Sequence, residues 1–207
     1  METKLLLIRH AVTSWHGQSR VLGQNDVPLD DAGVAQAKAL AQALSQIRLS
    51  RIVASPLARA FQTAALLGER VGSEVTPDPR LTDMLVGEWE GMTYEELAKR
   101  DDYRNFIRDP ISTIIPGGET IEEARDRALA AIADAESGAG GALAIVTHSD
   151  IVRLLLCHYL GVEAGRFLRF RVAVASVSAV SLNGTQAKVL GVNWTPAIED
   201  AIFSSIM

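Results

Sequence analysis

Two histidines and two arginines lie at or just beyond the ends of short apolar segments of this chain. Arg9 and His10 end the first such segment, and Arg59 and His148 follow two later ones. If these segments are parallel strands of one sheet, their carboxyl ends lie along the same edge. The sequence then predicts that the four side chains converge on one crevice.

A phosphoryl group is the ligand that suits this set of side chains. A neutral imidazole such as His10 can attack phosphorus and carry the phosphoryl group, and guanidinium groups match phosphate oxygens in a two-pronged geometry. Arg59 falls in the first turn of a predicted helix, where a cation is unfavourable unless an anion lies beside it. The alternatives are a core position for His10 and a solvent-exposed position for Arg59.

The segments that position these residues alternate between strands and helices. Short apolar runs predict buried strands, and apolar residues at helical spacing predict the helices between them. The predicted strands cover residues 4–8, 51–54, 143–146, 176–182 and 187–192, and the main helices start near 34, 56, 121 and 149. This order predicts a three-layer α/β/α sandwich with a mostly parallel sheet, and the turn at Asn183-Gly184 predicts an antiparallel edge.

Local signals set the ends of several helices. Ser55 followed by Pro56 predicts an N-cap with proline at the first helical position, and the helix that follows should run to about Val71. Thr120 and Glu123 form a predicted capping box. Residues 93–108 predict short surface helices, and Cys157 falls on an apolar helical face, which favours a core position.

Composition narrows the class of protein. The chain has 207 residues, 48% of them hydrophobic and 22% charged, which indicates one globular domain and excludes a disordered chain. The formal charge of −5 argues against nucleic acid as the main partner. A single cysteine, Cys157, forms no internal disulfide and favours a reducing, cytoplasmic compartment. The early apolar run is too short for a signal peptide or a membrane span, so we expect no membrane association.

An ordered series of motifs resembles the histidine phosphatase superfamily, the phosphoglycerate mutase-like proteins. The resemblance covers about residues 4–194. The motifs are Leu7–Ala11 with Thr13–Trp15, Gly23–Leu29, Ser55–Ala60 with Gln62–Ala64, Leu81 with Gly87–Gly91, Gly117–Thr120, and Val146–His148. A phosphoglycerate mutase-like fold is therefore expected.

The resemblance implies a role for each matching residue. His10 would be the nucleophile that becomes phosphohistidine, Arg9 and Arg59 would clamp the phosphoryl oxygens, and His148 would stabilise the transition state as a further phosphate ligand. His16 stands where an asparagine usually helps hold the phosphate. A histidine there can still donate a hydrogen bond, but its charge would vary near neutral pH.

Two further positions depart from the family pattern. Ser149 follows the second histidine, where glycine is frequent, and we assign it to the phosphate-binding residues. Asp83 stands where family members carry a glutamate that protonates the leaving group, and its side chain is one methylene shorter. We expect Asp83 to be the acid.

A proton donor must come within hydrogen-bond reach of the leaving oxygen, so a shorter side chain leaves room for other candidates. Glu88, Glu90 and Asp150 are the alternatives to Asp83. A surface position is the simpler expectation for Glu88 and Glu90, and a favourable charge at a helix start is the simpler expectation for Asp150.

The function predicted from these residues is a phosphomonoesterase that acts on a small phosphorylated metabolite, with no cofactor. No metal is implied, since the chain has no His-Glu-x-x-His motif and no carboxylate cluster at magnesium spacing. A phosphoglycerate mutase is the first alternative, although Lys99 is the one lysine between residues 84 and 147, which leaves little to bind the substrate carboxylate. A phospho-ligand binding module with little turnover is the second.

The chain is divided into a histidine phosphatase domain over residues 1–194 and a C-terminal tail over residues 195–207. The tail carries apolar residues at helical spacing, Ile198, Ala201, Ile202 and Ile206. An amphipathic tail of this kind is expected to dock either on its own domain or on a second subunit, and the second option would give a homodimer.

Overall fold

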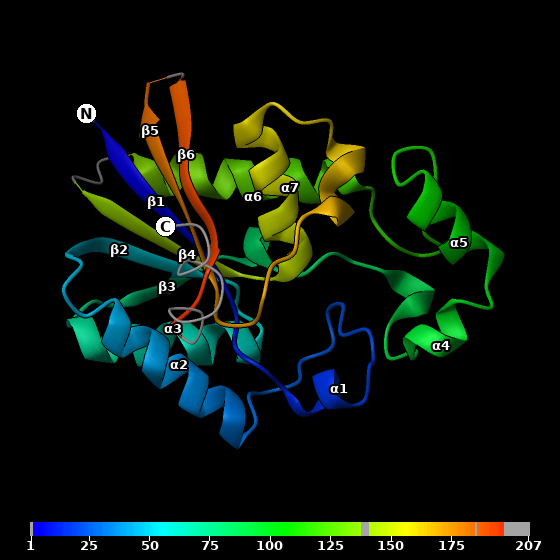
Figure 1. Cartoon of the computed structure of the whole chain (residues 1–207), viewed down its shortest axis with the longest axis horizontal. Helices are drawn as coiled ribbons and strands as arrows, with labels where there is room; N and C mark the ends of the chain where they lie inside the picture. Colours follow the sequence, from blue (N-terminus) through cyan, green and yellow to red (C-terminus); the bar gives the residue numbers. More distant parts are fainter. Residues whose placement is uncertain (1, 138–140, 185, 197–207) are drawn as a thin grey trace, which may run out of the picture.

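A six-stranded sheet forms the centre of the computed structural model, which describes residues 2–137, 141–184 and 186–196 (Figure 1). The strands lie in the order β3-β2-β4-β1-β5-β6. They are β1 (Thr3–Arg9), β2 (Leu49–Ala54), β3 (Val75–Pro77), β4 (Ala142–Thr147), β5 (Val177–Asn183) and β6 (Gln186–Trp194). The first four strands in this order are parallel, while β5 is antiparallel to β1 and β6 is antiparallel to β5. The predicted mostly parallel sheet with an antiparallel edge is confirmed.

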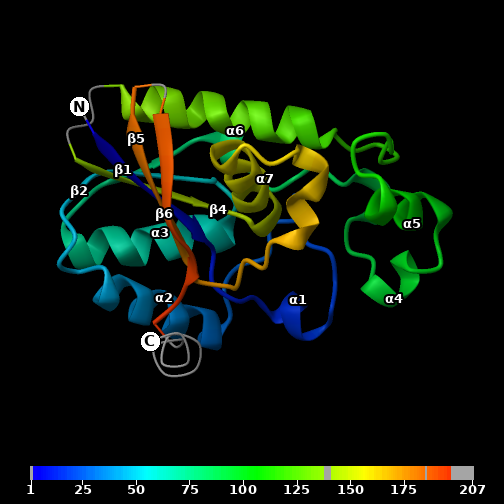
Figure 2. The same cartoon turned by 45° about the horizontal axis from the view of Figure 1, so that its top comes forward.

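Helices cover both faces of the sheet, which confirms the three-layer prediction (Figure 2). Helices α2 (Asp31–Ala43) and α3 (Ala58–Val71) pack on one face, and α6 (Ile121–Glu136) and α7 (Ser149–Leu160) pack on the other. Strand β1 shows why both faces are apolar. Leu5 and Leu7 belong to the core on the α6–α7 side, whereas Leu6 and Ile8 belong to the core on the α2–α3 side. This alternation is the period of two that a strand buried on both faces requires.

Short elements lie beyond the carboxyl ends of the strands. They are α1 (Ser14–Gly17), α4 (Tyr94–Leu97), α5 (Asp101–Arg108) and the 3₁₀ turns η1 (Pro79–Leu81), η2 (Gly87–Trp89) and η3 (Ala164–Arg169). The prediction of short helices over residues 93–108 is confirmed. Trp89 holds them to the domain, since its ring meets the rings of Tyr103 and Phe106 edge-on, at centroid distances of 5.3 Å each.

The predicted start of α3 is wrong in one respect. Ser55 is not its N-cap, because α3 begins at Ala58 and the N-cap position belongs to Leu57. The Ala58 N–H donates instead to Oδ1 of Asp26 at 2.6 Å. The Ser55 hydroxyl lies 2.8 Å from Nε2 of His148, and its oxygen also accepts from the Leu57 N–H at 3.3 Å. The predicted capping box of Thr120 and Glu123 at the start of α6 is confirmed.

Three further sequence predictions concern Cys157, the C-terminal tail and membrane association. Cys157 is 1% exposed and lies in the core, as expected. Residues 197–207, which hold the apolar positions of the predicted tail, lie outside the described residues, so the division at residue 194 stays a prediction. Within the described residues, no helix has the length and apolar character needed to cross a membrane.

We expect Leu7→Ala to lower the free energy of unfolding by about 2–5 kcal/mol, because it opens a cavity between the sheet and α6–α7. Leu7 is fully buried, whereas Leu190 on β6 is 50% exposed. Urea denaturation measures both variants, and Leu190→Ala is the matched control with a much smaller effect. Equal losses in the two variants would contradict the assignment of this core.

Candidate active site

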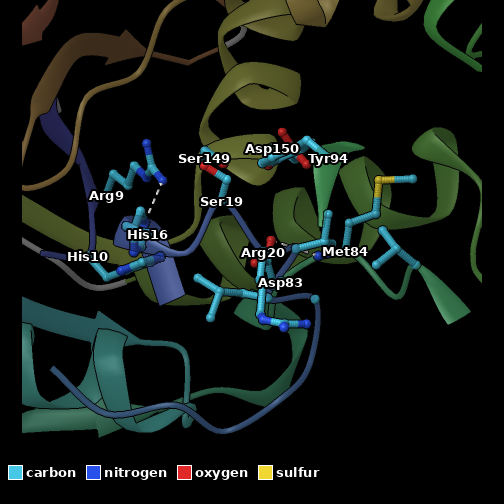
Figure 3. Close-up of a pocket in the computed structure, with 14 residues that line it drawn as sticks. Arg9, His10, His16, Ser19, Arg20, Asp83, Met84, Tyr94, Ser149 and Asp150 are labelled. Carbon is cyan, nitrogen blue, oxygen red and sulfur yellow. Dashed lines mark hydrogen bonds between the residues drawn. The ribbon is translucent and has the colours of Figure 1, made fainter. Parts of the chain in front are cut away.

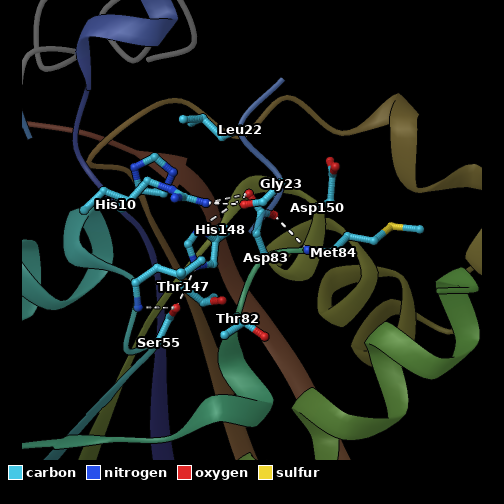
Figure 4. A network of polar contacts seen from close by, with 12 residues as sticks. His10, Leu22, Gly23, Ser55, Thr82, Asp83, Met84, Thr147, His148 and Asp150 are labelled. Atoms are coloured by element: carbon cyan, nitrogen blue, oxygen red, sulfur yellow. Dashed lines mark hydrogen bonds and ion pairs between the residues drawn. The ribbon is translucent and has the colours of Figure 1, made fainter. Parts of the chain in front are cut away.

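The strand register brings the sequence-predicted residues to one edge of the sheet. Arg9 of β1 pairs with Thr147 of β4, and Ala54 of β2 pairs with Val146 of the same strand. The residues that directly follow these strands, His10, Ser55 and His148, therefore lie side by side at the carboxyl edge of the sheet (Figure 4). The ring centroids of His10 and His148 lie 5.2 Å apart, so the structure brings the two predicted histidines together.

His10 has the protonation state of a nucleophile. Its side chain is 1% exposed, and Nδ1 lies 2.7 Å from the carbonyl oxygen of Ala11. Because a carbonyl only accepts, Nδ1 carries the proton and Nε2 keeps its lone pair. Burial lowers the pKa of His10 well below its ordinary value, and the charges of Arg9 and Arg59 lower it further. The ring is neutral at neutral pH.

His148 is oriented from both sides of its ring. Nε2 lies 2.8 Å from the Ser55 hydroxyl, and Nδ1 lies 3.5 Å from Oδ2 of Asp83. With Ser55 donating to Nε2, the ring proton is on Nδ1 and faces the Asp83 carboxyl. Burial is the main cause that lowers the pKa of His148, and Arg59 adds to it. His148 is therefore a neutral donor.

Arg59 lies wholly inside the protein. Its side chain has no exposed surface and donates to the carbonyl oxygens of Gly23 and Asn25, both at 2.7 Å, and to Oδ2 of Asp83 at 3.0 Å. The alternative of an arginine extending to solvent is wrong. Arg59 Nε has no hydrogen-bond partner among the described residues. A buried guanidinium requires an anion or several acceptors to offset its desolvation.

Asp83 lies on the loop after η1, and its Oδ2 lies 3.5 Å from Nδ1 of His148 despite its short side chain. Oδ1 accepts from the Met84 N–H at 3.0 Å, and Oδ2 contacts Arg59. Burial raises the pKa of Asp83 to about 6, an effect that the charge of Arg59 opposes and that of Asp150 assists. A carboxyl with this pKa can give and take a proton near neutral pH.

Arg127 holds the loop that carries Asp83, and sequence reasoning missed it. From α6 it donates to the backbone carbonyl oxygens of Thr82 at 2.9 Å and Asp83 at 3.0 Å. Glu119 pairs with Arg127 at 2.6 Å and accepts from the Leu85 N–H at 2.8 Å. No spacing signal links residue 127 to residue 83, because the contact joins two elements that meet only in the folded protein.

Arg9 and His16 form the other side of the site. Arg9 donates to the carbonyl oxygen of Val172 at 2.7 Å, and its second terminal nitrogen lies 3.0 Å from Nε2 of His16. The rings of His16 and His10 are 5.6 Å apart. Burial, with Arg9 assisting, lowers the pKa of His16 to about 4. The expectation that the charge of His16 varies near neutral pH is therefore wrong, because the site keeps the ring neutral.

A cavity of about 160 Å³ joins these groups (Figure 3). Of the sequence-predicted residues, Arg9, His10, His16, Asp83 and Ser149 line it. Arg59 and His148 do not line it; both are fully buried and contact Asp83. Residues that were not predicted also line it, among them Ser19, Arg20, Met84 and Tyr94.

The alternative acids differ in their placement. Glu88 is exposed and pairs with Arg100 at 2.9 Å, and Glu90 accepts from the Gln24 N–H at 2.9 Å. Neither lines the cavity, whereas Asp150 does. Asp150 is paired with Arg153 at 2.8 Å. Across the part of the chain that the structure describes, no group of three or more His, Cys, Asp or Glu side chains is arranged to hold a metal ion.

Comparison with known proteins gives the family. The profile of the histidine phosphatase superfamily, branch 1, matches residues 5–195. The chain belongs to this superfamily. It is 31% identical over 195 residues to phosphoserine phosphatase 1 of Hydrogenobacter thermophilus, covering 93% of this chain and 92% of that protein. It is 28% identical over 186 residues to the probable phosphoglycerate mutase GpmB of Salmonella choleraesuis, covering 88% and 86%.

Solved structures agree with this membership. The mycobacterial glucosyl-3-phosphoglycerate phosphatase superposes with a TM-score of 0.85 at 26% identity, covering 94% of this chain and 100% of that one. The α-ribazole phosphatase of Shigella flexneri superposes with a TM-score of 0.82 at 26% identity, covering 92% and 96%. The phosphoglycerate mutase-like fold and the class of phosphoric monoester hydrolase, both expected from the motifs, are confirmed.

We expect nitrogen NMR of the imidazole rings at pH 6 to show His10 neutral, with its proton on Nδ1, and His16 neutral as well. The reason is the Ala11 carbonyl at His10 and the lowered pKa of both rings. His10→Ala and His16→Ala variants assign the signals. A charged His10 at this pH would contradict the assignment of a free lone pair on Nε2.

Proposed function

We propose that this protein is a phosphomonoesterase that acts on a small phosphorylated metabolite through a phosphohistidine on His10. The arrangement of His10 carries the proposal. Its Nδ1 is bound to the Ala11 carbonyl, its Nε2 lone pair is free, and Asp83 lines the same cavity. A nucleophile and a proton donor in one cavity are the requirements for a displacement at phosphorus with a poor leaving group.

In the first step, Nε2 of His10 attacks phosphorus and the bond between phosphorus and the ester oxygen breaks. The leaving oxygen takes the proton of the Asp83 carboxyl, so the alcohol departs neutral and Asp83 becomes a carboxylate. Arg9 and the Nδ1–H of His148 are the groups placed to offset the charge of the phosphoryl oxygens. Nε2 of His16 faces Arg9 and Nδ1 faces the backbone N–H of Thr13, so His16 positions Arg9. Ser149, at the start of α7, adds its N–H and hydroxyl to this set.

In the second step, the Asp83 carboxylate takes a proton from water, and the water oxygen attacks phosphorus. The bond between phosphorus and Nε2 breaks, and its electron pair returns to His10. The products are inorganic phosphate, free His10 and a protonated Asp83. Arg59, bound to Asp83 at 3.0 Å, stabilises the carboxylate between the two steps. These steps need no cofactor and no metal ion.

Hydrolysis suits this site better than the mutase reaction named for one relative. A mutase must hold the carboxylate of a phosphoglycerate, which requires free cations around the leaving group. Lys99 is largely exposed and pairs with Glu95 at 3.0 Å. Arg100 pairs with Asp102 at 2.6 Å and with Glu88. Release of inorganic phosphate, without a requirement for a bisphosphate primer, would separate the two reactions.

Three wider predictions accompany the function, on the partner, the location and the oligomeric state. A small phosphoester is the partner we propose, and nucleic acid is not, given the charge of −5. A cytoplasmic location stays a prediction from the single Cys157. Homodimer formation through residues 195–207 also stays a prediction.

We expect His10→Ala to abolish phosphate release, because no other described group supplies a free imidazole nitrogen to the cavity. Asp83→Ala should lower kcat by about 10²–10⁴-fold, the range of a positioned proton donor. Purified protein is assayed with a panel of metabolite phosphates in the presence of a chelator. A binding module without turnover would release no phosphate above background, and an unchanged rate in Asp83→Ala would move the acid role to Asp150.

Labelled substrate provides an independent check of the intermediate. After an acid-free quench, wild-type protein should carry an acid-labile, base-stable phosphoryl group that His10→Ala lacks. His148→Ala should still become labelled, although more slowly, because His148 stabilises the transition state without forming the bond. Label that is found on His148, or that persists in His10→Ala, would contradict the mechanism.

The pH dependence should report the Asp83 carboxyl. With an alkyl phosphate, kcat/KM should fall as the pH rises above about 6, because the acid form of Asp83 is lost there. Asp83→Asn should be slow and should lack this fall. Ionisation of the substrate is common to both proteins, so the difference between the two profiles isolates the carboxyl. Profiles of the same shape would exclude Asp83 as the acid.

A further inference from the structure

A second cavity continues from the catalytic one. It has a volume of about 320 Å³ and shares with the first cavity Arg9, Met84, Tyr94, Ser149 and Asp150, among others. The two spaces therefore form one crevice. We call the second space the outer chamber. The residues that line it and not the first cavity are Trp89, Leu97, Tyr103, Phe106, Ile107, Arg153 and Leu168. A substrate bound through its phosphoryl group at His10 would extend its leaving group into the outer chamber.

The outer chamber has a polar side, with Arg9, Ser149, Asp150 and Arg153, and an apolar, aromatic side that includes Trp89, Tyr103, Phe106 and Leu168. Trp89 and Phe106 are buried, and their rings meet edge-on at a centroid distance of 5.3 Å. Ile107, which is 49% exposed, borders the chamber from α5. Such a surface favours an apolar or aromatic group, because burial removes its surface from water and aromatic edges pack against a ring.

Asp150 stands where the two spaces join. Its Oδ1 accepts from Arg153 at 2.8 Å, and its Oδ2 makes no hydrogen bond with the described residues. Figure 3 shows Asp150 beside Tyr94, across the cavity from Asp83. Asp150 lines both spaces, and its charge adds to the effect of burial, which is the main cause that raises the pKa of Tyr94 and of Asp83. A carboxylate on the substrate would meet a like charge here.

The arginines of this region already make hydrogen bonds within the protein. Arg153 donates to Asp150 and to the carbonyl oxygen of Phe170 at 2.9 Å. Arg20, which lines the catalytic cavity but not the outer chamber, donates to the carbonyl oxygen of Gly91 at 2.7 Å. Of the two arginines that line the outer chamber, Arg153 pairs with Asp150, and Arg9 donates to the carbonyl oxygen of Val172 and contacts His16. Arg20 in the adjoining cavity has only neutral acceptors and keeps its charge. Asp150 offers an acceptor to hydroxyl or amino groups.

We propose that the natural substrate is a phosphomonoester whose leaving group has an apolar or aromatic body seated in the outer chamber, and that Asp150 excludes leaving groups with a carboxylate. This inference rests on the proposed phosphatase function, since it concerns the same catalytic site. It names Asp150 as a specificity-determining residue. Phosphoserine and phosphoglycerate fall outside the proposed class, because both carry a carboxylate near the ester.

Matched aryl phosphates test the charge selection. For wild-type protein, kcat/KM with p-tolyl phosphate should exceed kcat/KM with 4-carboxyphenyl phosphate by about tenfold or more, although the carboxylated phenolate is the intrinsically better leaving group. Asp150→Asn should reduce this ratio about five- to tenfold, because it removes one like charge and frees Arg153. Glu95→Gln is the matched control, since it removes an exposed carboxylate on α4 outside the crevice and should leave the ratio unchanged.

A second variant tests the apolar seat. Ile107→Asn should lower kcat/KM for p-tolyl phosphate several-fold relative to glycerol 2-phosphate, which is too small to fill the outer chamber. Because Ile107 is half exposed, folding should tolerate this change. Equal decreases in kcat/KM for the two substrates would contradict binding of the leaving group in the outer chamber.

Two outcomes separate the inference from the function beneath it. The inference would be overturned, and the phosphatase function left intact, if the protein hydrolysed both aryl phosphates with similar kcat/KM values. The same holds if it preferred 4-carboxyphenyl phosphate and Arg20→Gln abolished that preference. Hydrolysis of neither, or hydrolysis that persists in His10→Ala, would overturn the proposed function and the inference with it.

Discussion

The buried charge of Arg59 is the constraint on which the site depends. A guanidinium without exposed surface is unstable unless acceptors surround it, and here they come from the loop at residues 23–25 and from Asp83. The same charge disfavours protonation of His10 and His148. One side chain thus ties two loops together. Burial is the main cause that keeps both imidazoles neutral, and the charge of Arg59 adds to it.

Asp83 shows how a shorter acid can occupy the position of a longer one. Hydrogen bonds from Arg127 on α6 to the backbone carbonyl oxygens of residues 82 and 83 hold its loop in place. Burial raises the pKa of the carboxyl, and Arg59 limits the rise, so the value stays at about 6. The position of the acid is set by the backbone, and its proton affinity is set by the balance of desolvation against one ion pair.

Chemistry and selection of the substrate are divided between two parts of one crevice. The residues around His10 come from the carboxyl ends of β1, β2 and β4, which are fixed by the sheet register. The outer chamber is built largely from α4, α5 and the turns beside them, which pack on Trp89. In the proposed function a rigid sheet edge holds the phosphoryl group, and the short elements beyond it can differ without disturbing that edge.

The sequence by itself determined the layers of the fold, the mostly parallel sheet and the placement of Arg9, His10 and His148 at one edge of it, because apolar periodicity and strand ends are local properties. It did not determine the role of Ser55. The sequence predicts a helix cap at Ser55, whereas in the structure Asp26 accepts from the Ala58 N–H and Ser55 contacts His148. Tertiary structure alone decided the neutrality of His16, the support of Asp83 by Arg127, and the placement of Asp150 in the crevice. Each of these depends on burial and on contacts between segments distant in the chain, which no local pattern records.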